Sequence, residues 1–407
     1  MPSARSSISL PRISRSSRWS RGSKTNLLAT TTKSIALLTA VYLAAILPIS
    51  SFAAPLRAAF LPPLDRSDVY QLTENLARTL GFTADAISPI QMIDPNIFAP
   101  RRYQAAIYTG RERYLYQVRK PGDAVSALMH YLSDGGTLIV AGVCWPFYRP
   151  CRWDGHDFVP YAGPLPTYSG PRDTWLEKQM ARLRQSPTGT FNRFLGLNIA
   201  GEGTEQFERP PDDDRLTVIV TDSGRRLFPS LPARVPFPSS GDLRFRPAFS
   251  RNLGPGIRYT SIATVVGESG KTYGDAICLI EHTSGRLAPG RVIYIWGTLI
   301  QGDLGRAIIL DALRLCARRA GICADAEARR AARLAAQLTK LATQAAALHS
   351  LPERTYFTRQ AMALADRARL AQAMADLGNA RRAQSILADI SSTAALLSRR
   401  VYSSQRL

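Results

Sequence analysis

The segment Gly135-Gly136-Thr-Leu-Ile-Val-Ala-Gly-Val-Cys144 constrains the fold of this chain more than any other. Its apolar run, residues 138–143, lies between a Gly-Gly turn and a cysteine that is followed by aromatic residues and prolines. A short apolar run bounded by turn residues is typical of a buried strand. In open α/β folds, ligands and nucleophiles lie at the carboxyl end of such strands. Cys144 is therefore either a nucleophile or a residue at the mouth of a binding loop.

Strand-like and helix-like patterns alternate through the middle of the chain. We expect strands at residues 56–61, 83–87, 103–109, 138–143, 216–220, 277–280 and 291–296, and helices at 68–80, 123–132, 175–183 and 307–317. Glycines close several of these segments, among them Gly81 and Gly110. Strands that alternate with helices predict an α/β fold with a mostly parallel sheet and flanking helices.

From Asp325 onward the composition changes to Ala, Leu, Arg and Gln. Apolar residues recur at intervals of three and four, which predicts amphipathic helices. Ser350-Leu-Pro-Glu353 has the form of a capping box, and Gly378-Asn379 interrupts the pattern. We therefore expect three antiparallel helices, as a bundle or a coiled-coil arm. They would either form a homo-oligomer or dock a partner, or pack on the α/β domain.

The first 54 residues have the composition of a leader. Residues 1–33 hold seven Lys and Arg and no acid, and an apolar run follows at 34–54. Ser51-Phe52-Ala53 fits a secretory cleavage site. A cleaved signal peptide and an uncleaved signal anchor remain open, with an organellar transit peptide as a third alternative. The first two predict an exported protein, periplasmic or extracellular, or one that is membrane-anchored through residues 34–54. The predicted domains are 1–54, 55–324 and 325–407.

The net charge of +21 does not indicate a nucleic-acid-binding protein. Residues 1–33 carry +7, and residues 325–407 carry thirteen Lys and Arg against six acids, again +7. The remaining 21 − 7 − 7 = +7 is spread over residues 34–324. No nucleic-acid-binding motif accompanies this mild excess, so we expect no nucleic acid among the partners.

Export would permit disulfides among the five cysteines. Cys144 and Cys151 bracket a proline-containing loop that could bring them together. Cys316 and Cys323 are too far apart on an unbroken helix, but Gly321 could end that helix and let the chain curl back. Cys278 lies in an apolar strand, where a thiol behaves as a small hydrophobic group.

Two regions of the chain resemble the class I glutamine amidotransferase-like fold. They are residues 103–148 and 275–305, and the matching motifs include Tyr131-Leu-Ser-Asp-Gly-Gly136 and Gly290-Arg-Val-Ile-Tyr-Ile-Trp-Gly297. The trehalose-utilisation (ThuA-like) and β-galactosidase-trimerisation types are the most similar. The resemblance implies a flavodoxin-like sheet and a link to sugar metabolism or envelope polysaccharide. In catalytic members a cysteine on a G-x-C-x-G elbow is the nucleophile, and a His and a Glu two residues apart activate it.

The chain departs from that catalytic pattern. Gly142-Val-Cys144 supplies half of the elbow, but Trp145-Pro146 replaces the rest, and Pro146 lacks the N–H donor. Glu281 and His282 are adjacent, and adjacent residues in a strand point to opposite faces of the sheet. We therefore expect a non-catalytic member, with a Cys144-dependent hydrolase or amidase that uses His282 as base as one alternative. A structural envelope protein that assembles through its C-terminal helices is another.

The long segment 145–172 is rich in aromatic residues, glycine and proline. Flat rings beside charged groups suit stacking on sugars, and the alternative is that the rings pack on one another. The candidate ligand-binding residues are Arg111, Arg113, Trp145, Phe147, Tyr148, Trp153, Asp154 and His156. His156 could bind a metal with Asp154 and Asp157, but a polar turn explains the same residues, and we expect no metal and no cofactor. We expect a ligand or a partner to bind at the carboxyl end of the sheet; a carbohydrate or another apolar ligand would suit these rings.

Overall fold

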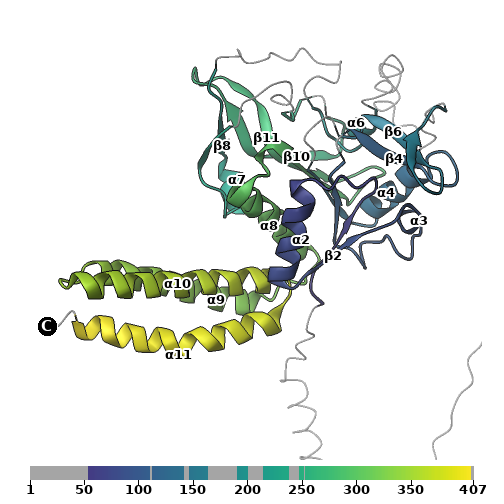
Figure 1. Ribbon diagram of the computed structural model, residues 1–407. Coiled ribbons are helices and arrows are strands. Elements are labelled where there is room, and N and C mark those ends of the chain that lie inside the picture. The colour runs from purple at the N-terminus through teal and green to yellow at the C-terminus, as the bar shows by residue number, and fades with distance from the viewer. Residues whose placement is uncertain are drawn as a thin grey trace, which may run out of the picture. The chain divides into compact units, whose positions relative to one another are not determined.

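Nine strands form one mixed sheet in the computed structural model of the chain (Figure 1). The structure describes residues 54–110, 112–141, 146–163, 190–199, 214–237, 247–251 and 253–404. The order of strands across the sheet is β2-β1-β3-β5-β12-β11-β10-β8-β9. The α/β class expected from the alternating pattern is confirmed.

One half of the sheet is parallel. Its strands are β1 (Arg57–Phe60), β2 (Thr83–Ala86), β3 (Ala105–Tyr108), β5 (Thr137–Val140) and β12 (Arg291–Ile295). β3, β5 and all of β1 but its first residue are fully buried, as strands covered on both faces must be. These strands lie where the apolar runs predicted them, with ends that differ by one to three residues.

The other half is antiparallel, and our expectation of a mostly parallel sheet was wrong there. It contains β8 (Thr217–Val220), β9 (Arg234–Pro236), β10 (Ile257–Val266) and β11 (Thr272–His282). β10 and β11 are joined by a short turn in which Gly270 has a φ of 80°. A connection this short can join only antiparallel strands, and β11 then pairs antiparallel with β12.

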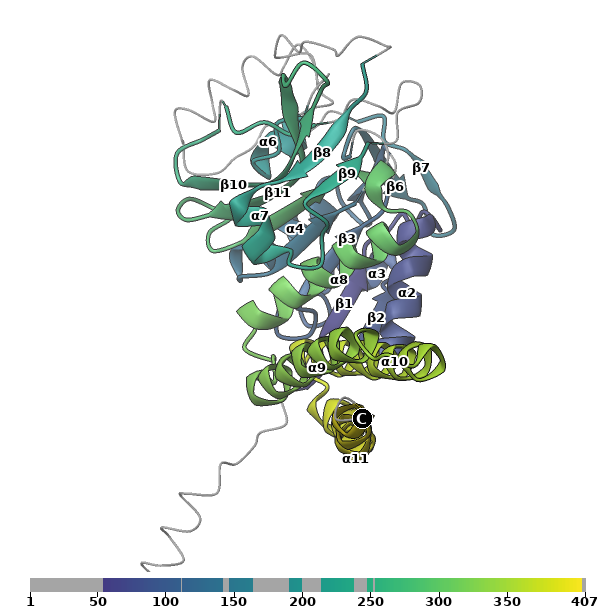
Figure 2. The same ribbon diagram turned by 90° about the vertical axis from the view of Figure 1, so that its left-hand side faces the viewer.

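Helices flank the sheet. α2 (Asp68–Leu80) and α8 (Gly302–Arg319) contact each other, and α3 (Pro89–Met92) contacts α4 (Asp123–Ser133) (Figure 2). Two short helices, α6 (Thr190–Phe194) and α7 (Asp222–Leu227), complete this part of the fold. α2 has the predicted bounds because its ends are set locally: Gly81 adopts a φ of 72° and donates its N–H to Ala77.

A second, three-stranded sheet was not predicted. β4 (Arg113–Gln117), β6 (Arg149–Trp153) and β7 (Phe158–Pro160) form it in the order β4-β6-β7. Because β4 follows β3 and β6 follows β5 along the chain, this small sheet leaves the large one from its carboxyl edge. Part of what we expected to be a loop, residues 145–172, is therefore a hairpin. The helix expected at 175–183 lies outside the described residues.

The C-terminal helices confirm the predicted antiparallel trio. They are α9 (Asp325–Ala346), α10 (Leu351–Asp376) and α11 (Ala380–Ser404) (Figure 1). Their buried faces consist largely of alanine and leucine. Several large apolar side chains remain exposed on α10 and α11: Leu351, Tyr356, Met362, Leu396 and Tyr402. Assembly through these helices stays a prediction.

Backbone hydrogen bonds join the base of the helical trio to the α/β part. Leu56 donates its N–H to the Leu377 carbonyl at 3.0 Å, and Ala324 donates to Ala375 at 2.8 Å. The Asn379 side-chain amide donates to the carbonyls of Leu80 and Gly81, both at 3.3 Å. The turn between α10 and α11 is thus fixed against the start of β1 and the end of α2.

A buried charge network reinforces the same junction. Arg314 of α8 contacts Asp311 at 3.2 Å and Asp376 of α10 at 3.1 Å, and its side chain is 11% exposed. Asp311 also accepts hydrogen bonds from the backbone and hydroxyl of Ser230. Burial raises the pKa of Asp311 and of Asp376, and the charge of Arg314 opposes that rise. One guanidinium therefore holds two buried carboxylates from two parts of the fold.

Replacing Arg314 by Met should lower the free energy of unfolding by about 3–5 kcal/mol, because it leaves buried carboxylates without their counter-charge. The matched control is Arg306→Met, which removes the same i, i+3 pairing on the exposed face of the same helix and should cost about 0–1 kcal/mol. Urea unfolding followed by circular dichroism measures both. Equal losses in the two variants would contradict a special role for the buried pair.

Within the described part of the chain, no helix is both long and apolar enough to cross a membrane. The leader predicted at 1–54 lies outside the described residues except for Ala54. Its cleavage, and export itself, remain predictions.

Candidate functional site

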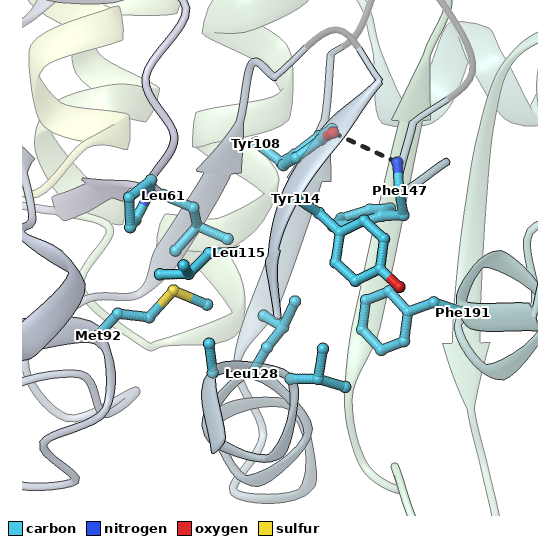
Figure 3. A pocket seen from close by; sticks show the side chains of 11 residues that line it. Leu61, Met92, Tyr108, Tyr114, Leu115, Leu128, Phe147 and Phe191 are labelled. Atoms are coloured by element: carbon cyan, nitrogen blue, oxygen red, sulfur yellow. Dashed lines mark hydrogen bonds between the residues drawn. The ribbon is translucent and has the colours of Figure 1, made fainter. Parts of the chain in front are cut away.

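The carboxyl ends of β1 and β3 enclose a small apolar cavity (Figure 3). Its walls come from the residues after β1, from α3, β4 and α4, and from two phenylalanines: Leu61, Pro62, Met92, Tyr108, Tyr114, Leu115, Ala124, Val125, Leu128, Phe147 and Phe191. The free volume is only about 10 Å³, which is the space of about one water molecule. The protein's own side chains fill this part of the carboxyl edge.

Phe147 is the side chain at the centre of this packed region. Its ring stacks on Tyr108 with the centroids 4.1 Å apart and meets Phe191 edge-on at 5.0 Å. Phe147 has a φ of 56°, a left-handed conformation that costs energy in a residue with a side chain. Its N–H donates to the Tyr108 hydroxyl at 3.3 Å, and Asn192 donates to the Pro146 carbonyl at 2.6 Å. These contacts hold the strained backbone so that the ring points into the protein.

The predicted ligand-binding aromatic residues differ in how deeply their side chains are buried. Phe147 is 2% exposed and belongs to the core, which corrects its assignment as an accessible ligand contact. Tyr148 is half-buried at the start of the small sheet, where its N–H donates to Glu112. Trp153 is also half-buried, but it lies on the β6–β7 hairpin, opposite Phe158 in the ladder. Trp145 and Arg111 lie outside the described residues.

The polar candidates lie on exposed parts of the small sheet. Arg113 begins β4 and is exposed. Asp154 and His156 form the turn of the hairpin, where Asp154 accepts hydrogen bonds from the N–H groups of His156 and Asp157 at 2.9 and 2.7 Å. These bonds lower the pKa of Asp154. The hydrogen bonds around Asp154 are those of a polar turn. Among the described residues, no three His, Cys, Asp or Glu side chains are grouped to hold a metal.

Glu281 and His282 point to opposite faces of the sheet, as their adjacency predicts. Glu281 pairs with Arg258 and Arg291, at 2.5 Å to each. His282 is buried on the other face, and its Nε2 lies 3.2 Å from the Leu195 carbonyl. Burial lowers the pKa of this imidazole. The carboxylate is thus engaged by arginines and takes no part in orienting the histidine.

His282 also lies at the opposite edge of the sheet from the end of β5. Val140 and Cys278 share one row of the sheet because both pair with Tyr294. His282 lies four positions after Cys278 in β11, a distance of about 13 Å along the strand. Cys144 follows β5 at the carboxyl edge and lies outside the described residues. The described geometry therefore gives no support to a Cys144–His282 dyad.

The other cysteines have the properties of structural thiols. Cys151, Cys278, Cys316 and Cys323 are all free. The proposed Cys316–Cys323 bridge is not formed: the chain turns at Gly321 towards α10 instead of folding back, and the Cys323 thiol lies 3.6 Å from Asp376. Burial raises the pKa of Cys151 to about 11 and that of Cys316 to about 12. Thiols with such pKa values are poor nucleophiles at neutral pH.

The lowered pKa of His282 predicts a specific pH dependence of stability. As the pH falls from about 7 to 5, the unfolded imidazole takes up a proton before the folded one does, so that the free energy of unfolding decreases. Replacing His282 by Gln should remove this component and flatten the dependence in that window. Urea unfolding at a series of pH values measures it, and the same slope in both proteins would contradict a neutral, buried histidine.

Comparison of the chain with protein-family models, with curated proteins and with solved structures gives no match.

Proposed function

We propose that this protein is an exported, non-catalytic member of the amidotransferase-like fold, and that it binds carbohydrate on its small sheet. Support for the fold comes from the order of the parallel strands. Numbered along the chain, β1, β2, β3, β5 and β12 lie in the order 2-1-3-4-5, which is the flavodoxin-like order.

The observation that carries the binding site is the aromatic pair on the β6–β7 hairpin. Trp153 and Phe158 are cross-strand partners with ring centroids 4.9 Å apart, and both are partly buried against the hydrophobic core. The carboxylates of Asp154 and Asp157 are exposed at the turn of the same hairpin. Flat rings that stack on the apolar face of a sugar, with charged groups to bond its hydroxyls, are the chemistry that carbohydrate recognition needs.

The filled cavity favours a polymer over a small molecule at this edge of the sheet. In the flavodoxin-like order, ligands bind where β1 and β3 diverge, and small-molecule pockets have volumes of about 300–1,000 Å³. Here Phe147 and its neighbours leave about 10 Å³ at that point. A polysaccharide laid across the hairpin needs no enclosed pocket, so these partly exposed rings suit an extended chain.

The absence of catalysis is the second part of the proposal. In the fold that the sequence resembles, one acid–histidine pair activates the cysteine. Here Glu281 is bound to two arginines, and His282 is buried about 13 Å along the sheet from the row of Val140. Both observations favour a protein that binds without cleaving.

Binding to a glycan array and to insoluble polysaccharides tests the proposal. We expect binding by the intact protein and a roughly tenfold loss in Trp153→Ala, equivalent to about 1.4 kcal/mol of stacking. The matched control is Tyr356→Ala, which removes an exposed aromatic ring from α10 and should leave binding unchanged. No glycan binding at all, or equal binding by Trp153→Ala and the intact protein, would refute the carbohydrate site.

A further inference from the structure

A polar cleft of about 350 Å³ lies at the amino edge of the sheet, the edge opposite to the aromatic hairpin. Strands β10, β11 and β12 form its floor, and α7 and α8 contribute its walls. The lining residues are Ser223, Arg226, Leu227, Arg258, Thr260, Leu279, Glu281, Arg291 and Leu315. We refer to it as the arginine cleft, after Arg226, Arg258 and Arg291.

The register of the sheet brings two of these arginines together around one carboxylate. Arg258 lies opposite Glu281 in the β10–β11 ladder, and Glu281 lies opposite Arg291 in the β11–β12 ladder. Directly opposed residues share a face of the sheet. The Glu281 side chain is 11% exposed, with Arg258 on one carboxylate oxygen and Arg291 on the other. Glu281 thereby fixes both guanidinium groups at the floor of the cleft.

Positive charge remains in excess after this pairing. Three lining arginines against Glu281, the only acid among the lining residues, give 3 − 1 = +2. Arg319 lies one helical turn after Leu315 on α8 and so is directed to the same side of that helix. Its pKa is lowered by burial and by the positive charge of Arg291. The charge of Glu281 opposes this lowering, and it is the excess of arginine over carboxylate in the lining that would favour an anion.

The cleft also offers unused hydrogen-bond donors. A guanidinium has five N–H groups, and Arg258 directs only Nε and Nη2 to Glu281. Its side chain is 63% exposed, so its remaining N–H groups can meet a ligand. Arg226 on the opposite wall is exposed and donates to the Ser223 hydroxyl at 3.1 Å. Planar guanidinium groups match the paired oxygens of carboxylates and phosphates.

We propose that the arginine cleft binds a small organic anion through a carboxylate or phosphate group. A volume of about 350 Å³ matches a small-molecule site. The two edges of the sheet would then carry different binding sites: the aromatic hairpin at the carboxyl edge and the anion site at the amino edge. This site does not depend on the carbohydrate proposal, because it shares no residue with the hairpin.

Isothermal titration calorimetry of the intact protein with inorganic phosphate, pyrophosphate and citrate tests the proposal. We expect saturable one-to-one binding of at least one of these anions, weakened by added sodium chloride because exposed charges are screened. The preferred anion distinguishes the two chemistries, since phosphate and pyrophosphate represent phosphoryl groups and citrate represents carboxylates.

Arg226→Gln is the decisive variant, because Arg226 is exposed and does not pair with Glu281, so that the fold should persist. We expect it to weaken binding at least fivefold, which corresponds to about 1 kcal/mol. Arg258→Gln should have a larger effect. Arg225→Gln is the matched control: it changes the neighbouring residue of α7, whose partner is Asp222, outside the cleft, and it should bind as the unchanged protein does.

Three results would overturn the proposal. The first is no saturable binding of any of the three anions at millimolar concentration. The second is an affinity in Arg226→Gln equal to that of the unchanged protein, and the third is an equal loss in Arg226→Gln and Arg225→Gln, which would indicate attraction by net charge alone. Circular dichroism of each variant confirms that it is folded.

Discussion

The pairing of β12 on its two sides determines where the carboxyl ends of β5 and β11 lie. β12 runs parallel to β5 on one side and antiparallel to β11 on the other. Because of this reversal, the end of β5 and the end of β11 lie at opposite edges of the sheet. Cys144 follows the first strand, and Glu281 and His282 end the second. One change in strand direction therefore separates the end of β5 from Glu281 and His282.

Buried carboxylates held by arginines recur at two important places. Asp376 fixes the helical trio to α8 through Arg314, and Glu281 fixes two arginines at the floor of the cleft. A buried ion pair adds little net stability compared with apolar packing, but it penalises strongly any arrangement that leaves one charge alone. In this protein such pairs specify geometry: one fixes the base of α10, and the other fixes the positions of charges on the sheet.

Features determined by local sequence could be predicted. The bounds of α2, the helix that precedes Gly135, and the three C-terminal helices follow from residue periodicity and from end signals such as Gly81. β10 could not be predicted, because irregular pairing between Ser261 and Val266 disturbs the alternation of its residues. The small sheet was missed for a different reason: its strands are short, and β6 and β7 contain proline.

The candidate site was less predictable than the fold. The adjacency of Glu281 and His282 correctly indicated opposite faces, and the turn at Asp154 was foreseen as polar. Nothing in the sequence marked Phe147 as a core residue, since its inward direction depends on a left-handed backbone held by Tyr108 and Asn192. The arginine cleft could not be predicted from the sequence, for another reason. Arg258, Glu281 and Arg291 become neighbours only through the registers of three strands.

We infer that His282, at the amino edge of the sheet, does not activate Cys144, which follows β5 in the sequence. The test is the rate of alkylation of Cys144 as a function of pH, in the unchanged protein and in His282→Gln. Mass spectrometry of the peptide that contains Cys144 follows the reaction. We expect the same pH profile of the alkylation rate in both proteins. A thiolate already reactive at acidic pH, whose reactivity His282→Gln abolishes, would contradict it.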